Sequence, residues 1–222
     1  MSDEAEKGPL TIDVISDVVC PWCYMGSRRL KAALAARPNV PVEVRWRPFQ
    51  LDPTIPPEGL DRHEYMARKF GPDRIAEIHL RLETAGREVG IPFAFDAIRR
   101  SPNTLDAHRL IRWAQGTGRQ TEIVEALFHA YFAEGRDIGE RTLLAEIAGA
   151  HGLDPDLVRV LLQDGSDEAS VREEIATAVR MGVSGVPFFL FGGRFGVPGA
   201  QAVEVLTAAI DKALEAGDTQ AA

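Results

Sequence analysis

The chain has 222 residues, of which 45% are apolar and 26% are charged, and its formal net charge is -8. This length and composition are typical of a soluble globular protein that buries its core as one domain, or as one domain with an insertion. No basic patch is visible in the sequence, so nucleic acid and anionic membranes would meet net repulsion. We therefore expect neither as a partner.

The N-terminal residues 1–7 contain no basic segment followed by an apolar one, and eighteen consecutive apolar residues occur nowhere in the chain. A secretory signal or a membrane span would need such segments, so we expect a cytoplasmic protein that does not enter membranes. A permanent disulfide is unusual in that reducing compartment, whereas a transient catalytic disulfide is common there. The sequence leaves the oligomeric state open, a homodimer included.

The first part of the chain predicts a β-α-β unit. Residues 12–19 are rich in Ile and Val, which is typical of a buried strand. Residues 25–36 have apolar side chains at helical spacing, and Pro38 stops that pattern. Residues 42–49 alternate apolar and charged side chains, as a half-buried strand does. We expect the two strands to be parallel.

The middle of the chain predicts helices only. A connection rich in Pro and Gly covers residues 51–60. Helical patterns follow, with Gly71 ending one helix and Pro72 beginning the next. Between about 60 and 180 no segment has a convincing strand pattern.

The last part of the chain predicts a β-hairpin and a helix. Residues 186–191 and 194–197 are apolar segments separated by Gly192-Gly193, a typical hairpin pattern. Residues 200–216 form an amphipathic helical pattern that would cover the sheet. The predicted order is therefore β-α-β, a block of helices, and then a hairpin and a helix.

The only two cysteines form the motif Cys20-Pro21-Trp22-Cys23 between the first predicted strand and helix. Unpaired N–H groups and the dipole at a helix N-terminus favour a negative charge, so a thiolate at Cys20 is stabilised there and is the predicted nucleophile. Cys23 lies one turn further into the helix and suits the role of the resolving thiol. This placement indicates redox chemistry.

Two other interpretations of the cysteines are weaker. A structural zinc site usually needs four ligands, and the five histidines are scattered singly, so we expect no metal. Free cysteines are also common as small core residues. The position of both thiols at a strand-to-helix junction favours the redox interpretation.

Five segments together resemble the DsbA-type thioredoxin-fold oxidoreductases, in their FrnE-like branch: 17–23, 48–51, 102–110, 185–189 and 199–201. This branch is related to 2-hydroxychromene-2-carboxylate isomerases and kappa-type glutathione transferases. The resemblance covers nearly the whole chain. It implies an α/β thioredoxin fold in which residues 8–55 and 182–222 form the thioredoxin-like domain. Residues 56–181 would be a helical domain inserted between the β-α-β half and the β-β-α half.

The resemblance also implies a substrate site around the cysteines. Pro187 would be cis, and its loop would face Cys20. The backbone of Val186 would then pair with an extended substrate segment, as an added strand does, with Pro21 and Trp22 beside it. Strongly oxidising relatives often carry His at the Trp22 position, so we expect a less strongly stabilised thiolate here.

Three further residues have two interpretations each. Asn103 and His108 lie near a predicted helix N-terminus, where a helix cap and a partly buried structural histidine explain them most simply. In related proteins the inserted helices overhang the active site. The alternative is therefore that Asn103, His108 and the apolar Phe188 line a substrate groove.

The predicted function is thiol–disulfide exchange, in which Cys20 attacks and Cys23 resolves the mixed disulfide with a protein or small-molecule thiol. No cofactor is expected beyond the Cys20–Cys23 redox pair, with glutathione as an alternative co-substrate. A second hypothesis is a glutathione-dependent isomerase or transferase of the 2-hydroxychromene-2-carboxylate isomerase type, but those relatives usually carry Ser in place of Cys20. A third is a chaperone-like binder of unfolded chains. The sequence does not determine the direction of the redox reaction.

Overall fold

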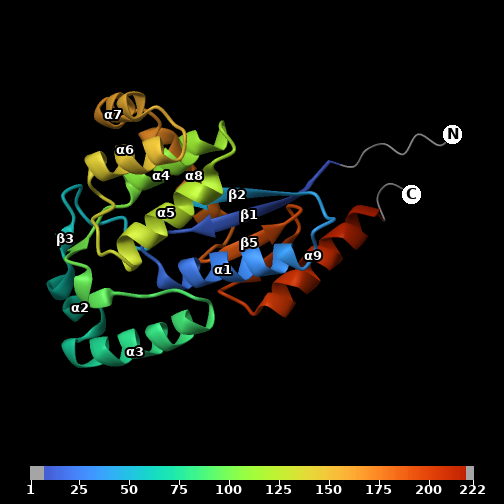
Figure 1. Ribbon diagram of the computed structural model, residues 1–222, viewed down its shortest axis with the longest axis horizontal. Coiled ribbons are helices and arrows are strands. Elements are labelled where there is room, and N and C mark those ends of the chain that lie inside the picture. Colours follow the sequence, from blue (N-terminus) through green and yellow to red (C-terminus); the bar gives the residue numbers. More distant parts are fainter. Residues whose placement is uncertain (1–7, 219–222) are drawn as a thin grey trace.

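The computed structural model describes residues 8–218 and contains a four-stranded mixed sheet (Figure 1). Its strands lie in the order β2-β1-β5-β6 and comprise β1 (Leu10–Ser16), β2 (Val42–Pro48), β5 (Phe188–Phe191) and β6 (Phe195–Pro198). β1 is parallel to β2 and antiparallel to β5, and β5 and β6 form an antiparallel hairpin. The β-α-β unit and the late hairpin expected from the sequence are both confirmed.

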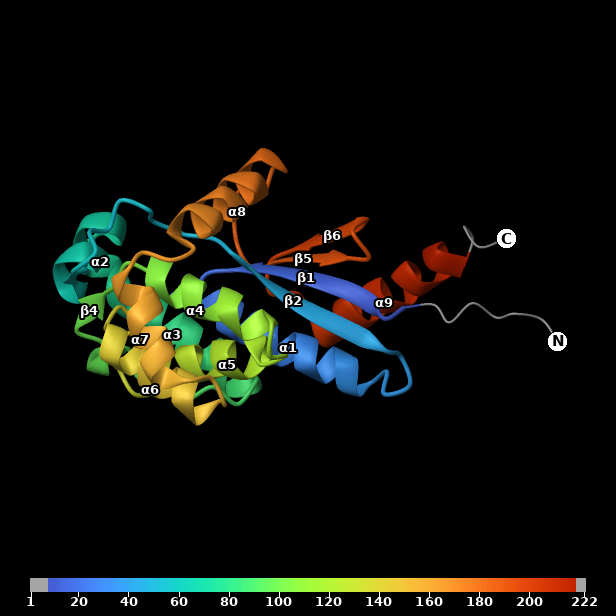
Figure 2. The ribbon, with the colours of Figure 1, turned by 90° about the horizontal axis from the view of Figure 1, so that it is seen from above.

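Helices cover both faces of this sheet. α1 (Pro21–Ala35) and α9 (Val203–Asp218) lie along one face, and α8 (Glu168–Arg180) lies against the other (Figure 2). Side chains of β1 pack against the helices on both faces of the sheet, because successive residues of a strand point to opposite faces. Val14 belongs to the main core, whereas Ile15 packs in a separate cluster with Ala178 of α8.

The segment between β2 and β5 is largely helical and forms the left-hand part of Figure 1. Besides α8 and a short 3-10 turn, its helices are α2 (Arg62–Phe70), α3 (Pro72–Glu88), α4 (Leu105–Gln115), α5 (Gln120–Phe132), α6 (Arg141–Ala150) and α7 (Pro155–Gln163). α4, α5 and α8 each contact β2, so the inserted helices pack on the sheet. Across residues 8–218, no helix is both long and apolar enough to span a bilayer.

The prediction that no strand occurs between about 60 and 180 is wrong. β3 (Leu60–Asp61) pairs antiparallel with β4 (Arg100–Ser101) inside the inserted segment. Each strand has only two residues, which is too short to show the period-two pattern by which strands are recognised in a sequence. This small pair joins the start of α2 to the segment that precedes α4.

An aromatic cluster joins α1 to the inserted helices. The Tyr24 ring stacks on Phe128 of α5 at a centroid distance of 5.0 Å, and it meets the edge of Phe93 at 6.1 Å. Tyr24 and Phe128 are completely buried, and Phe132 stacks beside both of them. Offset and edge contacts of this kind stabilise aromatic pairs beyond the area that they bury. The cluster therefore fixes α1 against the insertion.

The opposite side of α1 packs against the chain just before and within β5, at Gly26. A Cβ atom at this position would lie 3.0 Å from Cγ of Pro187 and 3.1 Å from the tip of the Phe189 ring. Such contacts are tighter than ordinary van der Waals packing, so only glycine lets the helix approach this closely without displacement. Gly26 thus sets the distance between α1 and the segment around Pro187.

We expect Gly26→Val to lower the free energy of unfolding by about 1–3 kcal/mol, because the added methyl groups overpack this contact. Valine has a higher helix propensity than glycine, so a destabilised variant would reflect the contact and not the helix. Gly116→Val is the matched control, since a Cβ there would meet only the Trp113 carbonyl at 3.8 Å. Urea denaturation measures both variants, and equal stabilities would contradict the prediction.

Candidate active site

Cys20 is the N-cap residue of α1, and Pro21 is its first helical residue. The Cys20 backbone is extended, with φ -93° and ψ 113°, and its N–H donates to the Asp17 carbonyl at 3.0 Å. The N–H groups of Cys23 and Tyr24 in turn donate to the Cys20 carbonyl. Proline suits the first helical position because the N–H it lacks would have no partner there. The predicted location of Cys20 at a strand-to-helix junction is confirmed.

The loop before β5 faces the first cysteine. The Val186–Pro187 peptide bond is cis, as the resemblance implied. Sγ of Cys20 lies 3.6 Å from the Val186 carbonyl oxygen, and the thiol donates a hydrogen bond to it. The Pro187 carbonyl accepts from the Gly199 N–H at 2.8 Å, which ties the loop to the chain after β6. Two segments 166 positions apart in the sequence thus meet at one sulfur atom.

Both cysteines are buried free thiols, and Cys20 is 4% and Cys23 1% exposed. Burial raises the pKa of the Cys23 thiol well above its ordinary value, and the hydrogen bond and charge interaction with Cys20 act in the same direction. The Ser16 hydroxyl and the Asp17 backbone N–H, which face the Cys23 sulfur, lower its pKa by a smaller amount. Cys23 is therefore protonated at neutral pH in the dithiol form.

A buried carboxylate that the sequence analysis did not single out lies beside the cysteines. Asp17 is almost fully buried, and its Oδ2 accepts from the Leu51 N–H at 2.8 Å. Its Oδ1 faces Nε2 of His108 at 3.5 Å, and that nitrogen is 2.9 Å from the Phe49 carbonyl oxygen. The only signal in the sequence is the position of this acid just before the motif. Asp17 and His108 join the end of β2 to α4.

A cavity of about 530 Å³ opens beside Cys20. Pro21, Trp22 and Val186 line it together with Cys20, and Trp22 is 43% exposed. The other walls come from the connection after β2, from α2 and α3, and from the chain between β4 and α4. The cavity is therefore shared by the sheet and the insertion. Its volume is in the range of small-molecule sites.

The cavity is not lined by Asn103, His108 or Phe188, the three residues of the groove alternative. The Asn103 side chain donates to the Ile55 carbonyl at 2.6 Å and accepts from the Leu105 N–H at 2.9 Å, so it ties the connection after β2 to the first residue of α4. His108 is a structural residue and is more fully buried than expected. The Phe188 ring lies over Gly196 of the neighbouring strand.

Basic and aromatic residues of α2 and α3 line the cavity instead of Asn103, His108 and Phe188. The cavity is lined by Arg62, Tyr65, Lys69, Arg74, His79 and Arg81, none of which was predicted as a site residue. They lie on two amphipathic helices with mixed charges, so nothing in the sequence distinguishes them from solvated surface residues. In the described part of the chain, no group of three or more His, Cys, Asp or Glu side chains is arranged to hold a metal ion.

A Cys-x-x-Cys pair at the start of a helix, facing a cis-proline loop on a β2-β1-β5-β6 sheet, defines a thioredoxin-fold protein. The family of DsbA-like thioredoxin domains matches residues 11–211. The chain belongs to this family, which confirms the DsbA-type resemblance.

Individual relatives agree with this assignment. The crystal structure of the "probable DsbA oxidoreductase SCO1869" from Streptomyces coelicolor has a TM-score of 0.83 and 31% identity, covering 93% of this chain and 90% of that one. The Bacillus subtilis protein YwbO is 26% identical over 200 residues, which are 90% of this chain and 94% of YwbO.

The cytosolic disulfide reductase DsbM from Pseudomonas aeruginosa shares the fold. Its TM-score is 0.63 at 22% identity, with 95% of this chain and 98% of DsbM covered, and its structure is also known with GSH.

The raised pKa of Cys23 predicts a loss of stability at alkaline pH. Above about pH 8.5 the thiol of the unfolded chain ionises while the folded thiol keeps its proton, so folding becomes less favourable as the pH rises. At pH 7 this contribution is fully present. Reduced wild type should therefore lose up to about 1.4 kcal/mol of unfolding free energy per pH unit, relative to Cys23→Ala. Urea denaturation under a phosphine reductant measures this, and parallel pH profiles would contradict it.

Proposed function

We propose that the protein is a thiol–disulfide oxidoreductase in which Cys20 attacks the substrate and Cys23 resolves the mixed disulfide. The observation that carries the proposal is the position of Cys20 at the helix N-terminus, on the wall of the cavity and 3.6 Å from the Val186 carbonyl. Cys23 lies one turn deeper and does not line the cavity. A substrate in the cavity would therefore reach Cys20 and not Cys23.

The chemistry follows from the two thiols. The Cys20 thiolate attacks one sulfur of a disulfide RSSR′, forming a Cys20–SR bond and releasing R′S⁻, which takes up a proton. Cys23 then loses its proton and attacks the Cys20 sulfur, which forms the Cys20–Cys23 disulfide and releases RS⁻. The cysteine pair loses two electrons and two protons, and the substrate gains them. The reverse sequence oxidises a dithiol.

A small thiol such as glutathione would return the Cys20–Cys23 disulfide to the dithiol. One glutathione thiolate attacks the disulfide to form a mixed disulfide, and a second one releases the protein thiol and leaves as glutathione disulfide. The DsbM structure with GSH supports a thiol of this kind as the co-substrate. No cofactor is required, because the electrons come from the thiols themselves.

The backbone beside Cys20 suits an extended substrate segment. Among residues 8–218, the Val186 N–H has no hydrogen-bond acceptor, and the Val186 carbonyl accepts only from the Cys20 thiol. An extended peptide or peptide-like thiol could pair with these groups as an added strand. This pairing would hold its sulfur next to Cys20.

Trapping tests the assignment of the two cysteines. We expect Cys23→Ala to accumulate a stable mixed disulfide through Cys20 when it meets glutathione disulfide, because the resolving thiol is missing. Intact-mass spectrometry would show one added glutathione per chain, removed by a phosphine reductant. Wild type should accumulate at least tenfold less of this adduct.

Cys20→Ala is the matched control and should form little adduct, because Cys23 lies behind the cavity wall. The double variant Cys20→Ala, Cys23→Ala reports any nonspecific addition. The assignment would be overturned if Cys23 in the Cys20→Ala variant formed the adduct as fast as Cys20 does in the Cys23→Ala variant. Glutathione-dependent turnover that survives Cys20→Ala would instead favour the isomerase or transferase hypothesis.

A further inference from the structure

We infer that the cavity beside Cys20 binds a small molecule that combines an apolar body with a carboxylate or similar acid group, held at Arg62. The inference rests on the proposed function for what happens at Cys20, because only a molecule of this class that also carries a thiol or disulfide would react there. The binding itself depends only on the walls of the cavity. It gives the oxidoreductase a substrate class.

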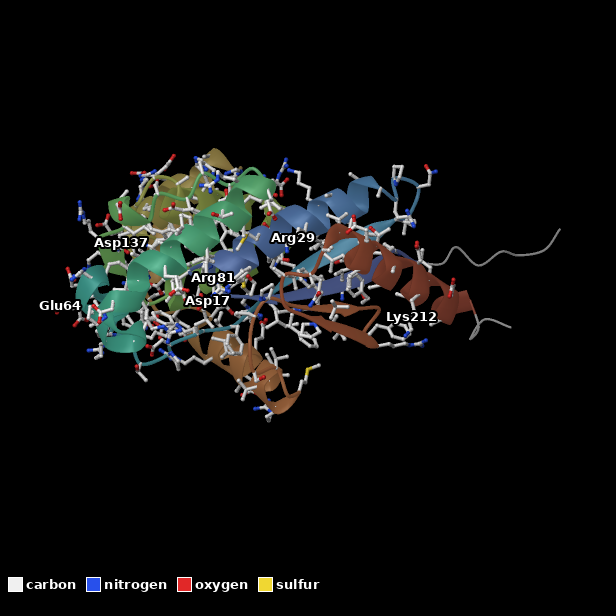
Figure 3. All side chains as sticks on the ribbon, turned by 90° about the horizontal axis from the view of Figure 1, so that it is seen from below. Asp17, Arg29, Glu64, Arg81, Asp137 and Lys212 are labelled. Carbon is white, nitrogen blue, oxygen red and sulfur yellow. The ribbon has the colours of Figure 1, made fainter. Side chains whose placement is uncertain are left out.

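The charge of the cavity walls is opposite to that of the whole chain. Four cationic side chains line the cavity, and only two carboxylates do, Asp17 and Asp52. The protein as a whole has a formal net charge of -8. A local excess of positive charge on an acidic protein attracts anionic ligands into that site. Figure 3 labels two of the charged wall residues, Arg81 on α3 and Asp17 after β1.

Two wall residues of opposite charge, Lys69 and Asp52, already offset each other through the Tyr65 hydroxyl. Asp52 accepts from the Thr54 hydroxyl at 2.5 Å and from the Tyr65 hydroxyl at 3.0 Å. Nζ of Lys69 donates to the same Tyr65 hydroxyl at 2.7 Å. Oδ2 of Asp17 accepts from the Leu51 N–H, whereas its buried Oδ1 makes no hydrogen bond and lies 3.5 Å from Nε2 of His108. The arginines of α2 and α3 are therefore the cations left for a ligand.

Arg62 has only neutral partners in the described part of the chain. Its Nη1 is 3.5 Å from the Ser101 hydroxyl and 3.4 Å from the Tyr131 hydroxyl, which are long distances for hydrogen bonds. No carboxylate of residues 8–218 lies within 4.0 Å of Arg62. Burial raises the pKa of Tyr131 to about 12, so that hydroxyl stays neutral. A half-buried guanidinium without an anion is best satisfied by a carboxylate.

A buried nitrogen of the cavity wall also lacks a partner. Nε2 of His79 is shielded from solvent and makes no hydrogen bond, while its ring stacks on Phe95 at 4.4 Å. Burial lowers the pKa of His79, and the charge of Arg62 acts in the same direction, so the ring is neutral at neutral pH. Unpaired buried polar atoms are rare, so His79 marks this wall as polar, but it adds no positive charge there.

The remaining walls suit an apolar body of limited size. They include the side chains Ile55, Met66, Ile78, Leu82 and Phe95. A volume of about 530 Å³ holds a molecule of drug-like size, whereas an unfolded chain needs a long open surface. A chaperone-like surface would also not need a half-buried arginine whose partners are all neutral. The charge and the size of the cavity therefore favour a small acid over an unfolded polypeptide.

Calorimetric titration with naphthalene-2-carboxylate and its neutral analogue naphthalene-2-carboxamide tests the inference. Both have the same apolar body, so their difference in Kd reports the acid group alone. We expect wild type to bind the carboxylate at least tenfold more tightly than the amide, because only the carboxylate forms a charge-assisted hydrogen bond with Arg62. Equal affinities, or binding of neither compound, would overturn the inference.

Substitutions of single arginines test whether the acid group of the ligand binds at Arg62. The preference for the carboxylate is the Kd of the amide divided by the Kd of the carboxylate. We expect Arg62→Gln to lower this ratio at least tenfold. Arg81→Gln, which changes an exposed wall residue, should lower it less. Arg172→Gln is the control, because Arg172 lies on α8 and does not line the cavity. Circular dichroism establishes that each variant is folded. A preference that Arg62→Gln leaves unchanged would overturn the site.

The titration separates this inference from the proposed function. The double variant Cys20→Ala, Cys23→Ala should keep the preference for the carboxylate, because neither thiol is needed for binding. If trapping fails and this preference persists, only the redox proposal is contradicted. If trapping succeeds and a reduced unfolded polypeptide binds while the two naphthalene compounds do not, the substrate class is contradicted instead.

Discussion

The packing of α1 between the sheet and the inserted helices is the constraint on which the site depends. On one side Tyr24 stacks on Phe128, and on the other Gly26 lies against Pro187. Because both contacts lie within two turns of the helix N-terminus, they fix where Cys20 stands relative to Val186. The Cys20 sulfur is thereby held 3.6 Å from the Val186 carbonyl oxygen.

The same arrangement separates the two thiols by depth. The N-cap position leaves Cys20 on the cavity wall, whereas one helical turn carries Cys23 behind it, where burial raises the pKa of its thiol. The proposed nucleophile and the proposed resolving thiol therefore differ through their surroundings and not through their chemistry. Beside the two cysteines, hydrogen bonds of Asp17 and His108 join the end of β2 to α4.

The sequence predicted the sheet side of the site well and the insertion side poorly. The strand before Cys20, the helix after it and the hairpin beyond Pro187 have strong local patterns, and the structure confirms them. β3 and β4 are too short to have a pattern. The cis bond before Pro187 came from resemblance alone, because most prolines are trans. The lining residues of α2 and α3 were not predicted, because exposure to a cavity depends on packing between distant segments.

By itself, the sequence determined the β-α-β start, the hairpin and the position of the Cys20–Cys23 pair at a strand-to-helix junction, because periodicity and helix-end chemistry act over a few residues. Only the tertiary structure decided what surrounds that pair. It brought Val186 to Cys20 across 166 positions and placed Arg62 and His79 of two mixed-charge helices on one cavity wall. The physical reason is that solvent access, charge balance and unpaired polar atoms arise where segments meet, and no local pattern records them.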